Sequence, residues 1–211
     1  TGVPNMDITL ELFDASGGRI FGSDASARGG GEIISQRAVT TGTYFLLVRE
    51  VWEDGKIPSE NITDAYTIET DWRPFNAEQW ELEPNNTPLK ATPLEPGAPL
   101  QGYLAGGKDR DCFKIAPAGA GSLAIDVPGV PGVNLVLELR HKAKDKAVVV
   151  DEGLISEGET VKDHKLGHGD VLLLCLRHML QGKKAPTGKT AAGLKHPYTV
   201  KTVWTPDKES K

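Results

Sequence analysis

Residues 129–139 read GVPGVNLVLEL, and the chain opens on the same pattern, GVPNMDITLEL, at residues 2–12. An offset of 127 residues lays Leu10 on Leu137 and keeps the Leu-Glu-Leu triplet in step. Within each stretch, apolar and polar residues alternate, which is the pattern of a β-strand that buries one face. This stretch therefore predicts strands, and its recurrence predicts that one fold occurs twice in the chain.

The match extends well beyond the opening stretch. The same offset brings YFLLV (44–48) onto VLLLC (171–175). The offset then becomes 132, which matches Tyr66 with Tyr198 further along. The change of offset falls where Gly, Pro and Lys cluster, as expected for a longer hairpin loop. Two copies of one fold explain both blocks.

The alternation and the turns together predict an all-β protein. Ile8, Leu10 and Leu12 should share the inward face of a strand in the first copy. The 24 glycines and 14 prolines argue against long helices. Short strands at spacings of roughly 8–12 residues indicate a β-sandwich or barrel. We expect about eight strands in the second copy and about five in the first, with the apolar run at 171–176 as a central strand.

The copies are unequal, and they end near Trp72 and Trp204, which the second offset also matches. The predicted organisation is a first domain at 1–74, a linker at 75–86, a second domain at 87–206 and a tail at 207–211. The first copy lacks a counterpart of residues 80–127, so we expect it to be incomplete at its N-terminus, with strand edges that upstream residues or another chain must cover. Thr1 is not an initiator Met, which suggests that the chain begins inside a longer precursor.

Composition excludes several classes of function. Lys and Arg number 24 against 29 Asp and Glu, a net charge of -5, which disfavours nucleic acid as a partner. No apolar run approaches the ~18 residues of a membrane span. Two cysteines cannot build a disulfide scaffold. Cys175 should share an inward face with Leu173, whereas Cys112 should point away from that face, which disfavours a bridge between them; a β-bulge would permit one, so their pairing stays open.

Three motifs in order resemble the bacterial pre-peptidase C-terminal domain family. They are Glu83-Pro84-Asn85-Asn86, then Gly102-Tyr103-Leu104, then Asp109-Arg110-Asp111-Cys112-Phe113, and GTYFLLV (42–48) is similar to a later strand of that family. The resemblance implies two jelly-roll-like antiparallel β-sandwich domains in tandem, similar to the collagen-binding domains of bacterial collagenases. It also implies an exported protein, secreted, periplasmic or on the cell surface. Members of the family trail secreted proteases, and relatives bind collagen, polysaccharide or calcium.

Hard oxygen donors gather at the entry to the second copy, and Ca²⁺ requires such donors. The predicted metal ligands are Glu81, Glu83, Asn85, Asn86, Asp109 and Asp111. The resemblance implies the same set, since calcium-binding members use a Glu-x-Glu-x-Asn segment ahead of the sandwich and aspartates before an early strand. The alternative is that these residues only form turns, since Asp and Asn side chains bond readily to nearby backbone.

The remaining motifs are weaker evidence for a chemical function. His164 and His168 have a spacing seen in helical zinc sites, but they flank a predicted strand end and are expected to be solvated. No Gly-x-Ser-x-Gly motif is present, and we expect no enzyme. Trp52, Trp80 and Tyr103 are the aromatic candidates for contact with a protein or polysaccharide partner.

The sequence therefore predicts a non-catalytic binding or spacer module of an exported bacterial protein. An alternative from another class is a processing segment that accompanies a secreted hydrolase and is removed from it or helps it to fold. A catalytic domain upstream in the same precursor would favour the accessory role.

Overall fold

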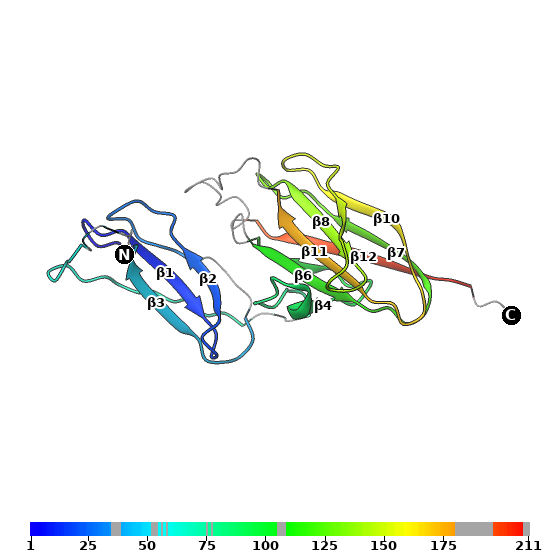
Figure 1. Ribbon diagram of the computed structural model, residues 1–211, viewed down its shortest axis with the longest axis horizontal. Coiled ribbons are helices and arrows are strands. Elements are labelled where there is room, and N and C mark those ends of the chain that lie inside the picture. Colours follow the sequence, from blue (N-terminus) through cyan, green and yellow to red (C-terminus); the bar gives the residue numbers. More distant parts are fainter. Residues whose placement is uncertain are drawn as a thin grey trace. The chain divides into compact units, whose positions relative to one another are not determined.

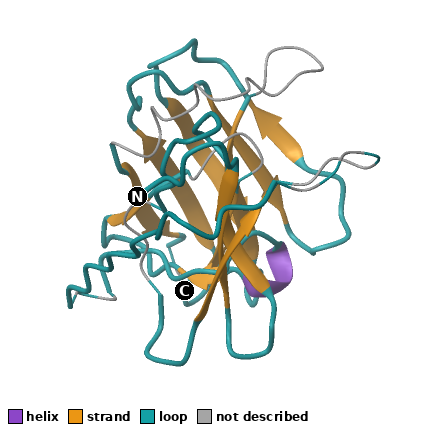
Figure 2. Ribbon diagram, turned by 90° about the vertical axis from the view of Figure 1, so that its left-hand side faces the viewer, coloured by secondary structure: helices purple, strands orange, loops and turns teal. Residues whose placement is uncertain are grey.

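The computed structural model of residues 1–211 describes residues 1–34, 39–51, 55, 57, 59–74, 76, 78–104, 109–179 and 196–208. The chain divides into two compact units, Thr1–Pro74 and Phe75–Pro186 with Thr190–Lys211. The described residues form strands and loops, with one short 3-10 turn at Pro88–Lys90 (Figure 2). The prediction of an all-β protein is confirmed. No helix among the described residues has the length and apolar character needed to cross a membrane.

The second unit is a β-sandwich of two sheets (Figure 1). One sheet has the order β10-β7-β12-β5, and the other has the order β4-β6-β11-β8-β9. Every neighbouring pair is antiparallel except β4 with β6. The strands are β4 (Thr92–Pro93), β5 (Leu100–Gly102), β6 (Arg110–Ile115), β7 (Gly121–Val127), β8 (Leu135–Arg140), β9 (Val148–Val150), β10 (Glu159–Leu166), β11 (Leu172–His178) and β12 (Tyr198–Pro206).

The core of this sandwich is built from strands whose inward residues recur at every second position. On β7, the residues Leu123, Ile125 and Val127 are buried, and the residues between them are only half-buried. Strand β11 lies between β6 and β8, and its first five residues are buried on both faces. The prediction of a central strand in this region is confirmed.

The outer face of the five-stranded sheet carries the disulfide. Cys112 on β6 lies directly opposite Cys175 on β11, and their sulfurs are bonded. The expectation that they point to opposite faces is wrong. Leu172, Leu174 and Leu176 belong to the core cluster, so the inward face of β11 is offset by one residue from the predicted one. A one-residue change of register moves every side chain of a strand to the other face.

The same outer face holds a half-buried ion cluster around Glu138. Its carboxylate accepts hydrogen bonds from Arg177 Nε at 2.7 Å and from an Arg140 terminal nitrogen at 2.8 Å, and it also pairs with Arg110. Burial and the like charges of the other two arginines lower the pKa of Arg110. One carboxylate therefore balances three guanidinium groups on a strand surface that the sequence shows only as alternating polar positions.

The first unit contains one three-stranded antiparallel sheet in its described residues. Its strands are β1 (Ile8–Phe13), β2 (Arg19–Ser23) and β3 (Phe45–Glu50), in the order β2-β1-β3. Ile8 is buried, whereas Leu10 and Leu12 are half-buried. On the other face, Glu11 forms ion pairs with Arg19 and Arg49.

The segment after this sheet departs from expectation. Residues 65–74 form no strand, so the prediction of two copies of one fold is wrong for this segment, which the repeat matches with β12. The described part of this unit therefore holds three strands, fewer than the five expected. A strand needs a hydrogen-bonded neighbour along its length, and no strand of the described residues pairs with this segment.

The strand pairing of the two units corresponds in part. Leu10 on β1 pairs with Ser23 on β2, and Leu137 on β8 pairs with Val150 on β9, so both partners differ by the same 127 residues. On the other side, Leu10 pairs with Val48 and Leu137 pairs with Leu176, a difference of 128 residues for the second partner. By strand pairing, Cys175 on β11 therefore corresponds to Leu47 on β3. The sequence match of Cys175 with Val48 is wrong by one residue.

Candidate metal centre

The segment before the sandwich presents three polar side chains in one direction. Glu81, Glu83 and Asn85 are buried, while Leu82 and Pro84 between them are half-buried. Alternate side chains of an extended chain point the same way, so the Glu-x-Glu-x-Asn spacing directs three oxygen-bearing groups to one place. The Glu83–Pro84 peptide bond is cis.

Backbone hydrogen bonds fix this segment on the sandwich. Glu81 N donates to Gln101 O at 2.8 Å, and Cys112 N donates to Asn85 O at 3.2 Å. The side chain of Thr92 donates to Leu82 O at 3.2 Å. Residues 81–85, which the sequence assigns to a linker, therefore lie along β5 and β6.

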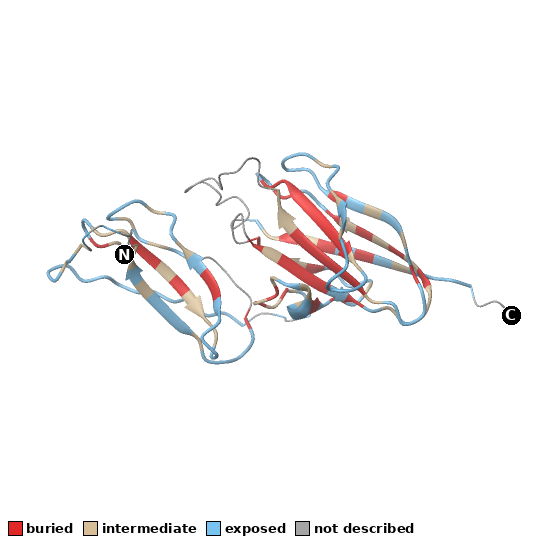
Figure 3. Ribbon diagram, in the orientation of Figure 1, coloured by how far each residue is buried: buried red, intermediate tan, exposed pale blue. Residues whose placement is uncertain are grey.

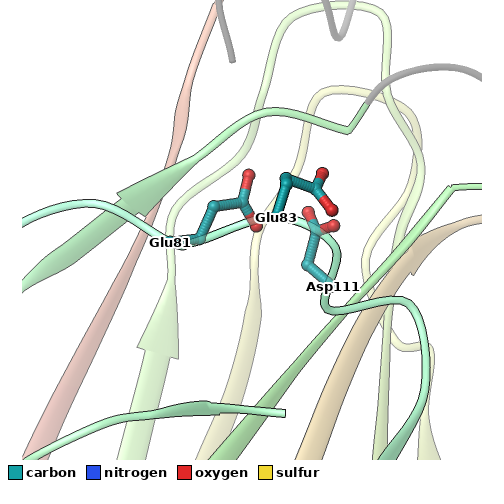
Figure 4. Close-up of side chains that lie close together, drawn as sticks. All are labelled: Glu81, Glu83 and Asp111. Atoms are coloured by element: carbon teal, nitrogen blue, oxygen red, sulfur yellow. The ribbon is translucent and has the colours of Figure 1, made fainter. Parts of the chain in front are cut away.

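Two aspartates complete the cluster from the start of β6. Asp111 is fully buried, and Asp109 is buried as well. One carboxylate oxygen from each of Glu81, Glu83 and Asp111 lies within 4.8 Å of the others. Figure 4 shows the carboxyl groups of Glu83 and Asp111 pointing toward one another, with Glu81 on the same segment as Glu83. The fold thus brings together residues that stand about 25 positions apart in the sequence.

Glu81 is held by three hydrogen bonds. Its Oε1 accepts from Tyr103 N at 2.7 Å, and its Oε2 accepts from the Tyr198 hydroxyl at 2.6 Å and from Asn85 Nδ2 at 3.0 Å. Gly102 makes this contact possible, because a Cβ there would lie 2.5 Å from Glu81 Cδ and closer still to the Tyr198 hydroxyl. The sequence pairs Tyr198 with Tyr66 but gives no sign of its bond to Glu81, since the two residues come from distant parts of the chain.

Asp111 and Asn85 supply buried oxygens with no donor among the described residues. Neither carboxylate oxygen of Asp111 accepts a hydrogen bond there, and the same holds for Asn85 Oδ1. The single hydroxyl proton of Tyr198 is used on Glu81. A buried anionic oxygen without a donor is costly unless a cation or a proton satisfies it.

Asn86 and Asp109 lie at the edge of the cluster. With its nitrogen turned toward them, the Asn86 amide donates to Asp109 Oδ1 and to Arg110 O, each at 3.2 Å. Asp109 Oδ1 also accepts from Arg110 N at 3.0 Å. In this arrangement Asn86 orients Asp109 and directs a donor, not an oxygen, toward it.

Burial and crowding of negative charge shift the protonation of the cluster. Burial raises the pKa of Glu81 to about 7, against the lowering effect of its bonds from Tyr198, Tyr103 and Asn85. Burial also raises the pKa of Asp111 well above its usual range, and the charges of Glu81, Asp109 and Glu83 raise it further, against a lowering effect of the Tyr198 hydroxyl, whose proton the geometry assigns to Glu81. The same burial and the nearby carboxylates raise the pKa of Tyr198. The cluster therefore favours protons or a cation over four free charges.

The residues fit Ca²⁺ by their chemistry. Ca²⁺ takes six to eight oxygen ligands, and carboxylates and amide oxygens are its usual protein donors. Glu81, Glu83 and Asp111 would hold the ion, with Asn85 Oδ1 as a neutral donor and Asp109 at the rim. Bound there, the ion would offset two of the negative charges of the cluster and join the segment at 81–85 to β6.

The predicted contact aromatics lie beside this cluster in part. The rings of Trp80 and Tyr103 are stacked, with centroids 5.5 Å apart and planes 17° apart, and both residues are half-buried. Trp80 directly precedes Glu81, and the backbone of Tyr103 donates to Glu81. Trp52 lies outside the described residues.

The histidines do not form a metal group with other ligands in the described part of the chain. His164 lies on β10, and its ring stacks on that of His141 at 5.3 Å between centroids. Burial and the neighbouring His141 lower the pKa of His164. His168 lies in the turn after β10, and it is exposed.

Solved structures similar to this chain include a collagenase domain and a lysozyme inhibitor. No family model matches the sequence, and no curated protein matches it. The pre-peptidase C-terminal domain of a collagenase from Bacillus anthracis is 17% identical over 53% of this chain and 93% of its own, with a TM-score of 0.39. PliG from Aeromonas hydrophila, a periplasmic inhibitor of g-type lysozyme, is 12% identical over 55% of this chain and 97% of its own, with a TM-score of 0.31. At such values the two similarities decide neither the fold nor the function of this chain.

Proposed function

We propose that this chain is a non-catalytic binding module of an exported protein and that a Ca²⁺ ion stabilises it at the Glu81–Glu83–Asp111 cluster. The observation that carries the proposal is the burial of these three carboxylates within 4.8 Å of one another, with both oxygens of Asp111 lacking a donor among the described residues. The resemblance of the sequence to pre-peptidase C-terminal domains agrees with this site.

The role of the metal is structural. Without a cation, the like charges of the cluster repel one another across the contact between residues 81–85 and β6. With Ca²⁺, the same carboxylates attract the ion and tighten that contact. The segment at 81–85 then becomes a fixed part of the sandwich, and the Trp80–Tyr103 stack beside it becomes a rigid surface.

Export is supported by the disulfide. Cys112 and Cys175 are bonded on a face of the sheet where both residues are fully buried. Disulfides of this kind form and persist in oxidising compartments such as the periplasm and the extracellular space. Millimolar calcium is also typical of extracellular sites, where weak calcium modules operate.

The partner is a protein or a polysaccharide, and the Trp80–Tyr103 stack is the surface that we assign to it. Aromatic rings with one accessible face stack on sugars and anchor protein partners. An array of polysaccharides and matrix proteins, probed with the wild type and with Trp80→Ala in calcium, tests this assignment. Binding that the substitution leaves unchanged would place the contact elsewhere.

Calcium binding is tested by calorimetric titration and by the melting temperature of the whole chain. We expect heat of binding and stabilisation by millimolar Ca²⁺ in the wild type, and the loss of both in Asp111→Asn. Asp207→Asn removes the same charge from an exposed position near the C-terminus and serves as the matched control. No heat and no stabilisation in the wild type, or an unchanged response in Asp111→Asn, would leave these residues as turn formers.

A further inference from the structure

The sheet of unit 1 corresponds to one side of the five-stranded sheet of unit 2. The β1–β2 and β8–β9 pairs share one register, as Leu10 with Ser23 and Leu137 with Val150 show. An ion pair recurs as well. Arg49 Nε donates to Glu11 at 3.1 Å on unit 1, and Arg177 Nε donates to Glu138 at 2.7 Å on unit 2. In the ladders, β3 therefore occupies the place of β11.

The two sheets differ on the far side of this strand. In unit 2, β11 pairs with β6 on that side, and its first five residues are buried. In unit 1, β1 is the only strand of the described residues that pairs with β3. Phe45, Leu46 and Leu47 on β3 are 55%, 37% and 41% exposed, and Figure 3 shows this strand largely in the colour of exposed residues. An apolar edge of this kind is a template for another strand.

Residues 66–72 of unit 1 also lack, among the described residues, the neighbouring strands that β12 has in unit 2. Residues 66–72 repeat the pattern of β12, with Tyr66 and Ile68 in the places of Tyr198 and Val200. On β12 these positions are buried in the core between β7 and β5. In unit 1, Tyr66 is 54% exposed and Ile68 is 47% exposed. The apolar face is present in the sequence, but the described residues provide no sheet for it to join.

The strands that β3 and residues 66–72 lack correspond to one contiguous segment of unit 2. In unit 2, the strands that pair with β11 and β12 on these sides are β6, β7 and β5, and together with β4 they occupy residues 92–127. That stretch runs directly into the Gly-Val-Pro at 129–131, whose counterpart is Gly2-Val3-Pro4. A counterpart of the four strands would therefore run directly into Thr1.

The position of Thr1 agrees with this connection. Its nitrogen donates to Thr67 O at 2.9 Å, and its hydroxyl accepts from Thr67 N at 3.1 Å. By the two sequence offsets, Thr1 stands in the place of Pro128 and Thr67 in the place of Thr199. Asp126 on β7 pairs with Lys201 on β12 in an antiparallel register. Two residues further along that register, the positions of Pro128 and Thr199 lie opposite one another. Thr1 thus lies where a strand equivalent to β7 would end.

We infer that unit 1 is completed by a segment that precedes Thr1 in the full-length protein and supplies the counterparts of β4, β5, β6 and β7. One of these strands pairs with the edge of β3 that no described strand joins, and two enclose residues 66–72. A second copy of this chain is the less suitable donor, since its own β6 is already bonded to β11 through the Cys112–Cys175 disulfide. The surface is therefore an intramolecular strand acceptor.

Hydrogen exchange on two proteins tests the inference. One is the 211-residue chain, and the other is the same chain extended by the ~50 residues that precede Thr1 in its precursor, a length set by the repeat unit. We expect both to be monomers by light scattering. We expect the amides of β3 and of residues 66–72 to exchange at least about tenfold more slowly in the extended protein, because strand pairing protects them.

A pair of substitutions gives an independent readout. Ile68→Lys places a charge on the face that the added sheet would bury, whereas Val203→Lys, the control, changes an exposed residue of β12. We expect Ile68→Lys to shift the melting of unit 1 by less than about 2 °C in the 211-residue chain and by more than about 10 °C in the extended protein. The control should shift neither protein.

Three results would overturn the inference. The first is equal amide exchange in the two proteins. The second is equal tolerance of Ile68→Lys. The third is a concentration-dependent dimer of the 211-residue chain with protected β3 amides, which would make a second copy the occupant.

Discussion

The buried carboxylate cluster predicts that stability falls with rising pH in the absence of calcium and falls much less in its presence. In the folded metal-free protein the pKa of Glu81 is raised from 4.5 to about 7. A carboxyl group with a raised pKa stabilises the fold fully below its unfolded value, and this contribution is lost as the pH rises through the folded value. In EDTA, the second unit should therefore lose stability between about pH 4.5 and pH 7.

The size of this loss can be worked out from the shift. One pKa unit corresponds to about 1.36 kcal/mol, so Glu81 alone contributes about 3 kcal/mol across the window. For a domain of this size, that change lowers the melting temperature by roughly 10 °C. The raised pKa of Asp111 has the same sign and adds to the loss.

Calcium should oppose the trend. The ion binds ionised carboxylates and competes with protons, so its stabilising effect should grow over the same pH window. At a concentration about 100 times the Kd, it should add about 2.7 kcal/mol. The two melting curves, one in EDTA and one in calcium, should therefore diverge as the pH rises.

The assay is thermal denaturation at several pH values between 4 and 8, with Asp111→Asn beside the wild type. The variant removes one charge from the cluster while the remaining ionisable groups of the chain stay the same, so the difference between the proteins isolates the site. We expect a flatter EDTA curve and no divergence in the variant. Two results would refute the reasoning. One is that the wild-type melting curves with and without calcium stay parallel as the pH rises. The other is that the melting temperature of the wild type in EDTA rises with pH relative to that of the variant.

Other parts of the second unit give three further predictions. Replacing Cys112 and Cys175 by Ser opens a link with a sequence separation of 63 residues, and denaturant unfolding should show a loss of about 4 kcal/mol; an unchanged midpoint would count against it. Glu138→Ala leaves three half-buried arginines without their shared partner, which should cost about 2–3 kcal/mol and make stability rise with added salt, unlike in the wild type. Gly102→Ala forces a methyl group against Glu81, so it should destabilise the fold and weaken calcium binding together, and separate effects would contradict the close approach of Gly102 to Glu81.

Local patterns determined the class of the fold and the side of the candidate site that residues 81–85 form. Alternation in the Leu-Glu-Leu stretch and the density of turn residues were sufficient for an all-β protein, because side-chain periodicity is a property of the strand itself. The Glu-x-Glu-x-Asn spacing likewise places Glu81, Glu83 and Asn85 on one side of an extended chain. These are relations between residues a few positions apart, and they do not depend on the rest of the molecule.

The tertiary structure decided whatever depends on the register between distant strands. The pairing of Cys112 with Cys175 rests on which face of β11 turns inward, and where apolar residues stand at successive positions, alternation cannot fix that face. The bond from Tyr198 to Glu81 joins residues 117 positions apart, and no local pattern carries such a contact. The apolar residues Tyr66, Ile68 and Trp72 match Tyr198, Val200 and Trp204 of β12, yet only β12 is a strand, because the hydrogen bonds that make a strand come from its neighbours.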